Sequence, residues 1–331
     1  MTVPSPDGRS GDLRLGVVGV GYLGQHHARI YSSLGGVRLV GVVDSSRPRA
    51  EEIGRKYGAQ AFDDHRLLLG HVDAVSVATP TVSHLAVAAD FLREGVAVLV
   101  EKPIATSLPE ADELISLAAR SHALLGVGHT ERFNPAVEAL RSRARDPRFI
   151  EVHRLGTFPA RSLDIDVVLD LMIHDIDLVL AMARDAGGAE VAALDAVGVD
   201  ALTRKVDIAN ARLRLSNGCV ANLTASRIST VKVRKVRVFT RDAYVSCDCA
   251  EQSLEHFSLR RGLDPGAVPA IARETPAIVR DEPLARELRA FVAAVRGGVP
   301  FEIGGAEGRQ ALAVALAVVE RIEEGLLESR R

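Results

Sequence analysis

Residues Leu13–Gly24 read LRLGVVGVGYLG, a short apolar run that leads directly into a glycine-rich turn. Gly19, Gly21 and Gly24 satisfy the spacing G-x-G-x-x-G, and Asp44 follows twenty residues after the last glycine. A strand before such a turn, a helix after it and an acid at this distance are typical of a βαβ unit that binds a dinucleotide. The sequence therefore predicts a dinucleotide-binding domain at this end of the chain.

Each glycine of this turn has an expected task. Gly19 permits the tight turn, Gly21 lets the backbone approach the pyrophosphate, and Gly24 lets the next helix sit close to the sheet. We expect the pyrophosphate at the start of that helix, near Tyr22 and Leu23, because unpaired N–H groups and the helix dipole favour an anion there.

The acid after the second apolar run indicates which dinucleotide is bound. Asp44 would hydrogen-bond to a free ribose 2′-hydroxyl and repel a 2′-phosphate. Arg47, three residues later, is a candidate to contact such a phosphate. We expect NAD rather than NADP.

The composition is that of a soluble globular protein with about two domains: 331 residues, 47% hydrophobic and 25% charged. A net charge of −2 argues against a nucleic-acid partner or an anionic membrane. No apolar run approaches the ~20 residues that span a bilayer. Residues 1–11 lack the apolar core of a signal peptide and predict a disordered lead-in, so we expect a cytoplasmic protein.

The three cysteines give no sign of a metal site. Cys247 and Cys249 are two residues apart on a predicted strand, and Cys219 stands alone. No histidine cluster with metal-ligand spacing lies near them, so we expect buried thiols and no metal.

Up to residue 128, valine-rich runs alternate with helical stretches, which predicts a Rossmann, doubly wound parallel sheet over residues 12–128. The expected strands are 13–18, 37–43, 74–77, 96–100 and 124–127, and the expected helices are 25–33, 49–57, 83–93 and 108–120.

Residues 129–331 predict a second, α+β domain for substrate binding and oligomerisation, with a large open, mostly antiparallel sheet. Strand-like runs follow one another there without helices between them. Residues 261–280 are expected to form a long surface excursion, and the last helix is a candidate to pack back on the first domain. The expected strands are 149–156, 191–199, 208–215, 219–227, 231–240 and 243–247, and the expected helices are 135–143, 167–182, 283–295 and 306–327.

Two polar turns follow predicted strands of the first sheet. Thr79, Pro80 and His84 either start and cap a helix or lie against the nicotinamide ribose, and the residues leave both open. Glu101 and Lys102 are either a solvated ion pair or a functional pair whose direction is restricted by the proline that follows. A lysine near a positively charged nicotinamide would have a lowered pKa and could accept a proton.

A third polar group lies on the helix predicted over residues 167–182. Helical spacing puts Asp170, His174 and Asp177 on one stripe and Asp175 away from it. A histidine satisfied by its neighbours is one interpretation. Acids on an otherwise apolar helix are costly unless paired or used, and a carboxylate beside an imidazole raises its basicity, so we favour function.

The order GVGYLG, ATP, EKP and DLMIHDID resembles the Gfo/Idh/MocA family of nicotinamide-dependent sugar oxidoreductases over nearly the whole chain. Within that family, residues 126–137 (GVGHTERFNPAV) and 166–180 (DVVLDLMIHDIDLVL) are similar to bacterial enzymes that oxidise UDP-N-acetylglucosamine at C3. Those enzymes supply an aminotransferase on the route to a diamino sugar of lipid A.

The resemblance implies that Lys102 and His174 are catalytic, that Asp170 supports them, and that the family's sheet-face packing gives a homodimer or homotetramer. Which base takes the proton first stays open. The expected cofactor residues are Gly19, Gly21, Tyr22, Leu23, Gly24, Asp44, Thr79, Pro80, His84 and Glu101.

Besides Lys102 and His174, three residues are candidates to bind the substrate. Arg132 and Asn134 stand at the start of a helix, where they either solvate that start or contact hydroxyls and phosphates. Arg161 is a second candidate for the diphosphate. The implied reaction is NAD-dependent oxidation of UDP-N-acetylglucosamine at C3. A dehydrogenase of a free sugar or polyol, such as inositol, and a non-catalytic sugar and dinucleotide sensor are the alternatives.

Overall fold

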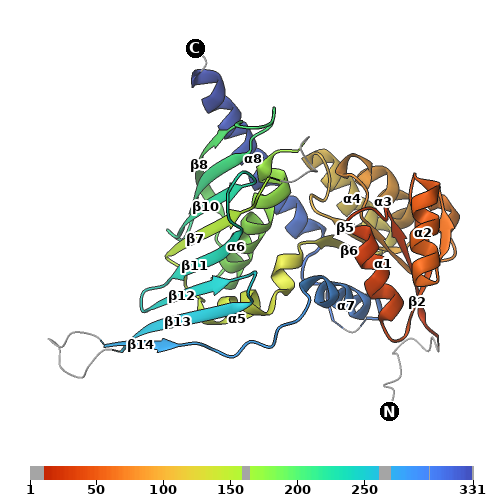
Figure 1. The fold of residues 1–331 in the computed structure, drawn as a ribbon, viewed down its shortest axis with the longest axis horizontal. Helices are drawn as coiled ribbons and strands as arrows, with labels where there is room; N and C mark the ends of the chain where they lie inside the picture. The colour runs from red at the N-terminus through yellow and green to blue at the C-terminus, as the bar shows by residue number, and fades with distance from the viewer. Residues whose placement is uncertain (1–10, 159–164, 261–269, 298, 330–331) are drawn as a thin grey trace. The chain divides into compact units, whose positions relative to one another are not determined.

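The structure is a computed structural model that describes residues 11–158, 165–260, 270–297 and 299–329 (Figure 1). Its backbone divides into two compact units. The first comprises residues up to Thr130 with Leu284–Arg309, and the second comprises Glu131–Pro283 with Gln310–Arg331. The functional division expected between residues 128 and 129 stays a prediction. The expected lead-in lies outside the described residues except for residue 11.

The first unit is built on a six-stranded sheet in which every neighbouring pair is parallel. The strand order is β3-β2-β1-β4-β5-β6, so the winding reverses between β1 and β4, the switch point where such sheets bind ligands. The doubly wound fold predicted from the sequence is confirmed. The strands are β1 (Leu13–Val18), β2 (Val37–Val43), β3 (Gln60–Phe62), β4 (Ala74–Val77), β5 (Ala97–Glu101) and β6 (Leu125–Gly128).

Helices α1 to α4 each stand between two strands of this sheet in the chain, as parallel pairing requires. Helix α1 packs against α2, and α3 packs against α4. Strands β4 and β5 are buried at every position, as expected of a sheet covered on both faces. The helices are α1 (Gly24–Ser33), α2 (Arg47–Tyr57), α3 (His84–Arg93), α4 (Leu108–Ser121) and α7 (Pro283–Val295), with the 3₁₀ turns η1 (His65–Leu68) and η2 (Thr81–Ser83).

The second unit is built on an eight-stranded sheet in the order β14-β13-β12-β11-β7-β10-β9-β8. Every neighbouring pair is antiparallel except β7 with β10, so the predicted open, mostly antiparallel sheet is confirmed. The strands are β7 (Phe149–Leu155), β8 (Val191–Val199), β9 (Ile208–Leu215), β10 (Val220–Ser226), β11 (Val233–Phe239), β12 (Ala243–Asp248), β13 (Ser253–Arg260) and β14 (Ala270–Glu274).

Two strands of this sheet depart from the sequence prediction. No strand was expected over β13, and the surface excursion expected over residues 261–280 is wrong for β14. That segment extends the sheet because β14 pairs with β13 from His256↔Glu274 to Arg260↔Ala270. Residues 261–269 lie outside the described part of the chain.

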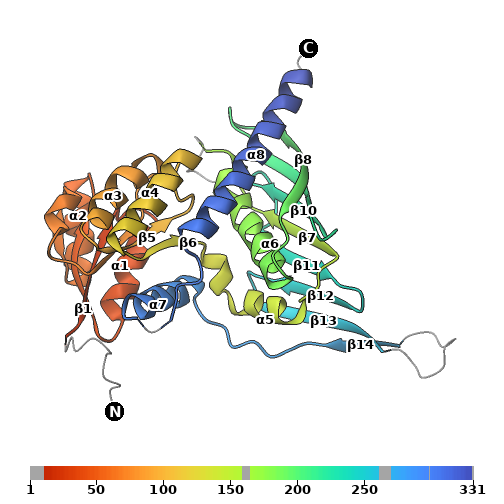
Figure 2. The ribbon, with the colours of Figure 1, turned by 180° about the vertical axis from the view of Figure 1, so that it is seen from behind.

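One face of the second sheet carries the core of this unit. Burial alternates along β7, where Ile150, Val152 and Arg154 are buried and the residues between them are half-buried. Figures 1 and 2 show α6 and α8 along this covered face. The helical elements of the unit are η3 (Thr130–Phe133), α5 (Pro135–Arg143), η4 (Val168–Met172), α6 (Ile173–Asp185) and α8 (Gly305–Ser329), the last of which begins in the first unit.

The helix predicted over residues 167–182 is not regular. A π turn, η4, occupies Val168–Met172 and runs directly into α6. Such turns are rare and are frequent at functional sites. In the described residues, no helix has the length and apolar character to cross a membrane, and no group of three or more His, Cys, Asp or Glu side chains is arranged to hold a metal ion.

Candidate functional site

The glycine-rich turn between β1 and α1 has the geometry that its spacing predicts. Gly19 lies at φ +83°, and a Cβ there would stand 2.7 Å from the Thr79 amide nitrogen. A Cβ at Gly24 would overlap the Gly19 carbonyl oxygen, so α1 can pack this closely only through a glycine. A Cβ at Gly21 would meet no atom of the described residues within 4 Å, which leaves its backbone open to a ligand.

The start of α1 is suited to an anion. It has no capping side chain and no acidic residue in its first turn, so its own first turn does not compete for the leading N–H groups. Tyr22 and Leu23 expose 58% and 40% of their surfaces at this end. The open Gly21 backbone and the uncapped helix fit the pyrophosphate of a dinucleotide.

Asp44 is held beside this turn at the end of β2. Its carboxylate accepts hydrogen bonds from the Val20 amide at 3.0 Å and the Ser46 amide at 2.9 Å. An ionised carboxylate has about four acceptor sites, so these bonds leave room for hydroxyl donors.

Arg47 pairs with Glu51 at 2.8 Å and lies 3.8 Å from Asp63. The candidate cation for a 2′-phosphate therefore has two acids of its own chain beside it.

The turn after β4 contains a buried hydroxyl group. Thr79 Oγ1 is buried and has no hydrogen-bond partner among the described residues, an arrangement that costs about 1–3 kcal/mol. A polar atom of a bound ligand would satisfy it. Pro80 follows, and its carbonyl oxygen accepts from the Ser83 amide at 2.9 Å to start η2.

His84, expected at the cofactor, is 1% exposed and faces two backbone carbonyls. Nδ1 lies 2.9 Å from the Pro103 oxygen and Nε2 lies 3.0 Å from the Thr79 oxygen. Burial lowers the pKa of the imidazole, although the two carbonyls oppose that shift. Both ring nitrogens are occupied within the chain, which counts against direct contact of His84 with a cofactor.

Glu101, Lys102 and Pro103 follow at the end of β5, with a cis peptide bond between the last two. Burial opposes ionisation of Glu101, but the hydrogen bond from His27, together with nearby positive charges, lowers the pKa of the carboxyl below its usual range. The carboxylate accepts from His27 Nε2 at 3.0 Å and from the Lys102 amide at 3.3 Å. An ionised acid therefore holds the backbone of the predicted catalytic lysine.

The second unit separates the polar residues of the π turn and α6 into two groups. Asp170 in the π turn and His174 in the first turn of α6 are half-buried. Asp175 and Asp177 are each 1% exposed. Asp170 and His174 are therefore the more accessible pair, in line with the predicted functional stripe.

Asp175 and Asp177 are paired with buried arginines. Arg154 Nη2 donates to Asp175 at 2.6 Å. Arg154 also pairs with Glu131, at 2.9 Å. Arg132 Nε and Nη2 donate to the two oxygens of Asp177, both at 2.7 Å. These bonds to Arg132 count against a functional role for Asp177 beside Asp170 and His174.

Arg132 and Asn134, the two expected substrate contacts at the start of α5, also bond to other residues of the chain. The Arg132 side chain is 1% exposed in its pair with Asp177. Asn134 caps α5 by accepting from the Ala136 amide, and its amide group donates to the Cys249 carbonyl at 2.9 Å. These bonds count against the predicted substrate role of Arg132 and Asn134, which stays untested. Arg161 lies outside the described residues.

Sequence reasoning missed His27 and Arg154. Each is a polar residue at a buried position of an otherwise regular pattern: His27 on the covered face of α1, and Arg154 on the apolar phase of β7. That mismatch was the available signal. Their partners, Glu101 and Asp175, come 74 and 21 residues later, so the sequence alone could not pair them.

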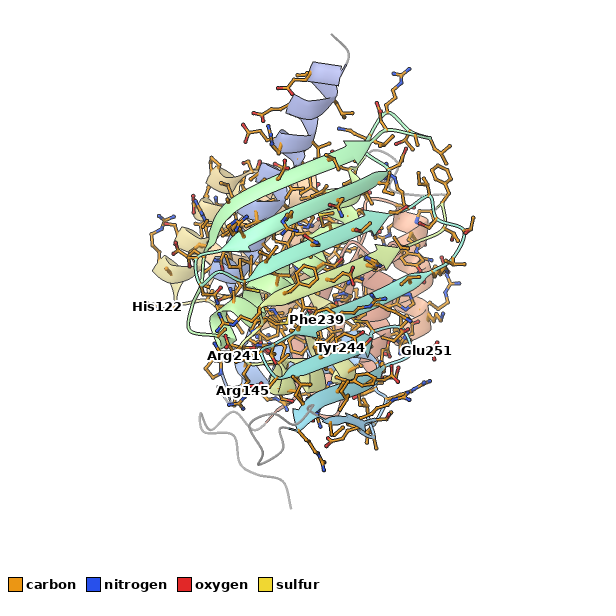
Figure 3. The ribbon with its side chains drawn as sticks, turned by 90° about the vertical axis from the view of Figure 1, so that its left-hand side faces the viewer. His122, Arg145, Phe239, Arg241, Tyr244 and Glu251 are labelled. Carbon is orange, nitrogen blue, oxygen red and sulfur yellow. The ribbon has the colours of Figure 1, made fainter. Side chains whose placement is uncertain are left out.

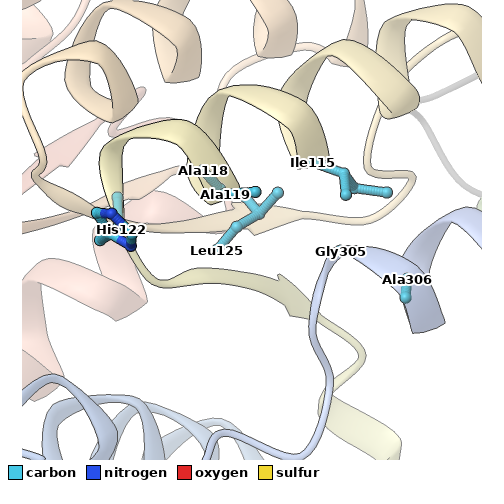
Figure 4. A pocket seen from close by; sticks show the side chains of 8 residues that line it. Ile115, Ala118, Ala119, His122, Leu125, Gly305 and Ala306 are labelled. Carbon is cyan, nitrogen blue, oxygen red and sulfur yellow. The ribbon is translucent and has the colours of Figure 1, made fainter.

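A hollow in the first unit is distinct from these residues. It lies between the end of α4 and the start of α8 and is lined mainly by apolar side chains, including Ile115, Leu125 and the ring of His122 (Figure 4). It contains none of the predicted site residues.

Several known proteins are similar to this chain. A family model described as an oxidoreductase family with an NAD-binding Rossmann fold, GFO_IDH_MocA, matches residues 13–129. UDP-N-acetylglucosamine 3-dehydrogenase of Acidithiobacillus ferrooxidans is 41% identical, over 94% of this chain and 97% of that protein. Inositol 2-dehydrogenase of Rhizobium meliloti is 27% identical over the same shares.

A solved structure of the Acidithiobacillus ferrooxidans enzyme has a TM-score of 0.86 to this chain, at 40% identity, and the match covers 95% of this chain and 98% of that one. The likeness thus extends through both sheets and is not confined to the dinucleotide-binding half. With the glycine turn, the EKP triplet and the Asp170–His174 pair in place, this chain belongs to the Gfo/Idh/MocA family of oxidoreductases, whose first domain is an NAD-binding Rossmann fold.

Proposed function

We propose that this protein oxidises the C3 hydroxyl of UDP-N-acetylglucosamine with NAD, giving UDP-3-keto-N-acetylglucosamine. The observation that carries the proposal is 41% identity, over 94% of the chain, to an enzyme named for that reaction. A dehydrogenase of a free polyol is the second candidate, because the inositol 2-dehydrogenase relative matches over the same share of the chain at 27% identity.

The residues of the first unit fit a nicotinamide dinucleotide. Three observations on the described residues support this fit: the open backbone at Gly21, the uncapped start of α1, and the Thr79 hydroxyl without a partner there. A bound nicotinamide would accept the hydride that leaves the substrate carbon. Asp44 would bind the adenosine ribose hydroxyls, which favours NAD over NADP.

Two side chains are proposed to remove the hydroxyl proton. Lys102 follows β5, and Glu101 holds its backbone amide. His174 is half-buried at the start of α6, where Asp170 precedes it by one turn. A carboxylate near an imidazole raises its basicity and orients it, so Asp170 is proposed to support His174.

The substrate is tested with a panel of UDP-sugars and myo-inositol, each mixed with the protein and NAD and followed by the absorbance of NADH. A sugar-nucleotide aminotransferase with its amino donor is added in parallel reactions, because removal of the ketone draws an unfavourable equilibrium forward. NADH formation with UDP-N-acetylglucosamine, increased by the aminotransferase, is the expected result. Reduction of NAD by myo-inositol alone would favour the second candidate, and no reduction with any sugar would favour a non-catalytic sensor.

The preference for NAD gives a prediction at Asp44. Replacing Asp44 with alanine removes acceptors for the ribose hydroxyls, so kcat/KM for NAD falls about 10- to 100-fold, as expected for loss of a charged hydrogen bond. The loss with NADP is smaller, since the repulsion of its phosphate is removed. Steady-state kinetics with both cofactors measure the ratio. An Arg47→Ala control leaves the ratio within about twofold of the wild type, because that guanidinium pairs with acids of its own chain. An unchanged ratio in Asp44→Ala would contradict the assignment.

We also propose that the protein assembles through the outer face of its second sheet. Four aromatic rings face one another across neighbouring strands of this face: Phe149, Phe239, Tyr244 and Phe257, with centroids 4.7–5.7 Å apart. The guanidinium of Arg273 extends the row, 5.7 Å from the Phe257 ring. Figure 3 shows Phe239 and Tyr244 on the sheet face turned toward the viewer. Aromatic side chains are enriched in the centres of protein interfaces. This row therefore supports a homodimer or homotetramer.

Replacing Phe239 with glutamate is expected to dissociate this assembly, because it places a charge within the aromatic row. Sedimentation velocity gives the molar mass of wild type and variant at equal concentrations. Val279→Glu is the matched control, since Val279 is 87% exposed in the same unit. A wild-type protein that sediments as a monomer, or a Phe239→Glu variant with unchanged mass, would refute assembly through this face.

Two further parts of the proposal concern the cell. We place the reaction in the cytoplasm, and we place an aminotransferase that acts on the 3-keto sugar directly after it. Cell fractionation tests the first, and the coupled reaction described above tests the second.

A further inference from the structure

Two buried histidines contact the residues on either side of Lys102. His27 lies on α1 and His84 is the first residue of α3, and each is 1% exposed. Neither ring is accessible to a substrate. Both instead face the Glu101–Lys102–Pro103 triplet, one before the lysine and one after it.

The contact before the lysine has two steps. His27 Nε2 donates to Glu101 Oε1 at 3.0 Å, and Glu101 Oε2 accepts from the Lys102 amide at 3.3 Å. The His27 and Glu101 side chains are 1% and 9% exposed, so water does not replace this bond. The histidine thus orients the carboxylate that holds the backbone of Lys102.

The contact after the lysine uses a backbone carbonyl. His84 Nδ1 lies 2.9 Å from the Pro103 oxygen, while Nε2 lies 3.0 Å from the Thr79 oxygen. The ring therefore joins the end of β5 to the turn after β4. A neutral imidazole carries one N–H, so only one of these two contacts is a full hydrogen bond at a time.

We propose that His27 and His84 are positioning residues for Lys102, which they hold from both sides through Glu101 and the Pro103 carbonyl. The inference rests on the proposed catalytic role of Lys102. A displacement of a reacting group by about 1 Å costs about 100-fold in rate, so a change at either histidine lowers kcat although neither touches the substrate.

Because the two histidines use different ring nitrogens for these contacts, asparagine and glutamine are expected to have opposite effects at the two positions. Asparagine places its amide nitrogen near the position of histidine Nδ1, and glutamine places its own near Nε2. His84→Asn therefore keeps the contact with Pro103, while His84→Gln keeps only the contact with Thr79. At His27 the order reverses, because the bond to Glu101 comes from Nε2: His27→Gln keeps it and His27→Asn loses it.

The variant that loses its contact with the Glu101–Lys102–Pro103 triplet is expected to have the lower kcat at each position. His84→Gln and His27→Asn lose about 100-fold in kcat with little change in the KM for NAD. His84→Asn and His27→Gln keep kcat within about fivefold. His84→Asn instead raises the KM for NAD, because it releases the Thr79 turn. A purely structural role for these histidines would lower the melting temperature, but it would not make asparagine preserve kcat at position 84 and glutamine preserve it at position 27.

Matched controls come from His65, whose Nε2 lies 3.0 Å from Asp90 in the same unit. His65→Asn and His65→Gln are expected to leave kcat unchanged. Melting curves and NAD titrations are recorded for every variant. If the two variants of one histidine fail to fold, the two variants of the other histidine test the proposal. Equal kcat for asparagine and glutamine at both positions, in folded protein, overturns the inference. Lys102→Met separates this from the proposed function: if that variant keeps its activity, the catalytic assignment of Lys102 has failed instead.

Discussion

Replacing Lys102 with methionine lowers kcat by about 100- to 10,000-fold, the usual contribution of a general acid or base, while the affinity for NAD stays within about threefold. Methionine keeps the length of the side chain and removes the amine that accepts the proton. His174→Ala is expected to give a loss in the same range, because the imidazole is the second proposed acceptor. Single-turnover formation of NADH, with NAD binding measured by fluorescence titration, separates chemistry from cofactor affinity.

A lysine control and a variant of Asp170 accompany these two replacements. Lys56, exposed on α2, is replaced with methionine to show that loss of a lysine elsewhere in the first unit has no effect. Asp170→Asn tests the support of His174 and is expected to shift the pH dependence of kcat, since the imidazole loses a nearby carboxylate. Near-normal turnover in either Lys102→Met or His174→Ala would refute the assignment of that residue.

Replacing Asp177 with asparagine lowers the free energy of unfolding by about 3–5 kcal/mol, because it leaves the buried Arg132 charge without its partner. Both side chains of this pair are at most 2% exposed, so water cannot stabilise the remaining guanidinium. Urea denaturation, with the midpoint and the slope recorded, measures the change.

A double variant distinguishes the structural interpretation of Arg132 from the predicted substrate contact. Arg132→Met with Asp177→Leu removes both charges and is expected to recover most of the stability. It also keeps the KM for the sugar nucleotide near the wild-type value. A KM raised tenfold or more in the folded double variant would restore Arg132 as a substrate contact; a loss of stability as large as in Asp177→Asn would show that the pair contributes more than mutual neutralisation.

The fold of the first unit could be predicted because its patterns are local. Strands buried on both faces read as continuous apolar runs, and the helices between them have clear spacing, so each of the predicted strands lies within one residue of its observed bounds. Strand β3, with three residues at the sheet edge, is too short to produce a pattern. Strand β14 forms because the exposed edge of β13 pairs with it, and that pairing is not encoded in the apolar periodicity of residues 270–274.

The parts of the candidate site whose residues are consecutive or regularly spaced in the sequence could be predicted. The glycine turn, Asp44 and the acid–base triplet each occupy consecutive or regularly spaced positions. The π turn at Val168–Met172 could not be predicted, because an inserted residue in a helix leaves no separate composition signal. The pairs of Arg132 with Asp177 and of His27 with Glu101 depend on partners distant in the chain, which only the fold brings together.

The hydrogen at C3 of the sugar shows whether the proposed oxidation takes place. UDP-N-acetylglucosamine that carries deuterium only at C3 is incubated with the protein, NAD and the coupled aminotransferase, and the reduced cofactor is analysed by mass spectrometry. We predict NADH that is heavier by one deuterium, together with a slower reaction than for the unlabelled sugar. Unlabelled NADH from this substrate, or no NADH at all while myo-inositol reduces NAD, would contradict the proposed oxidation.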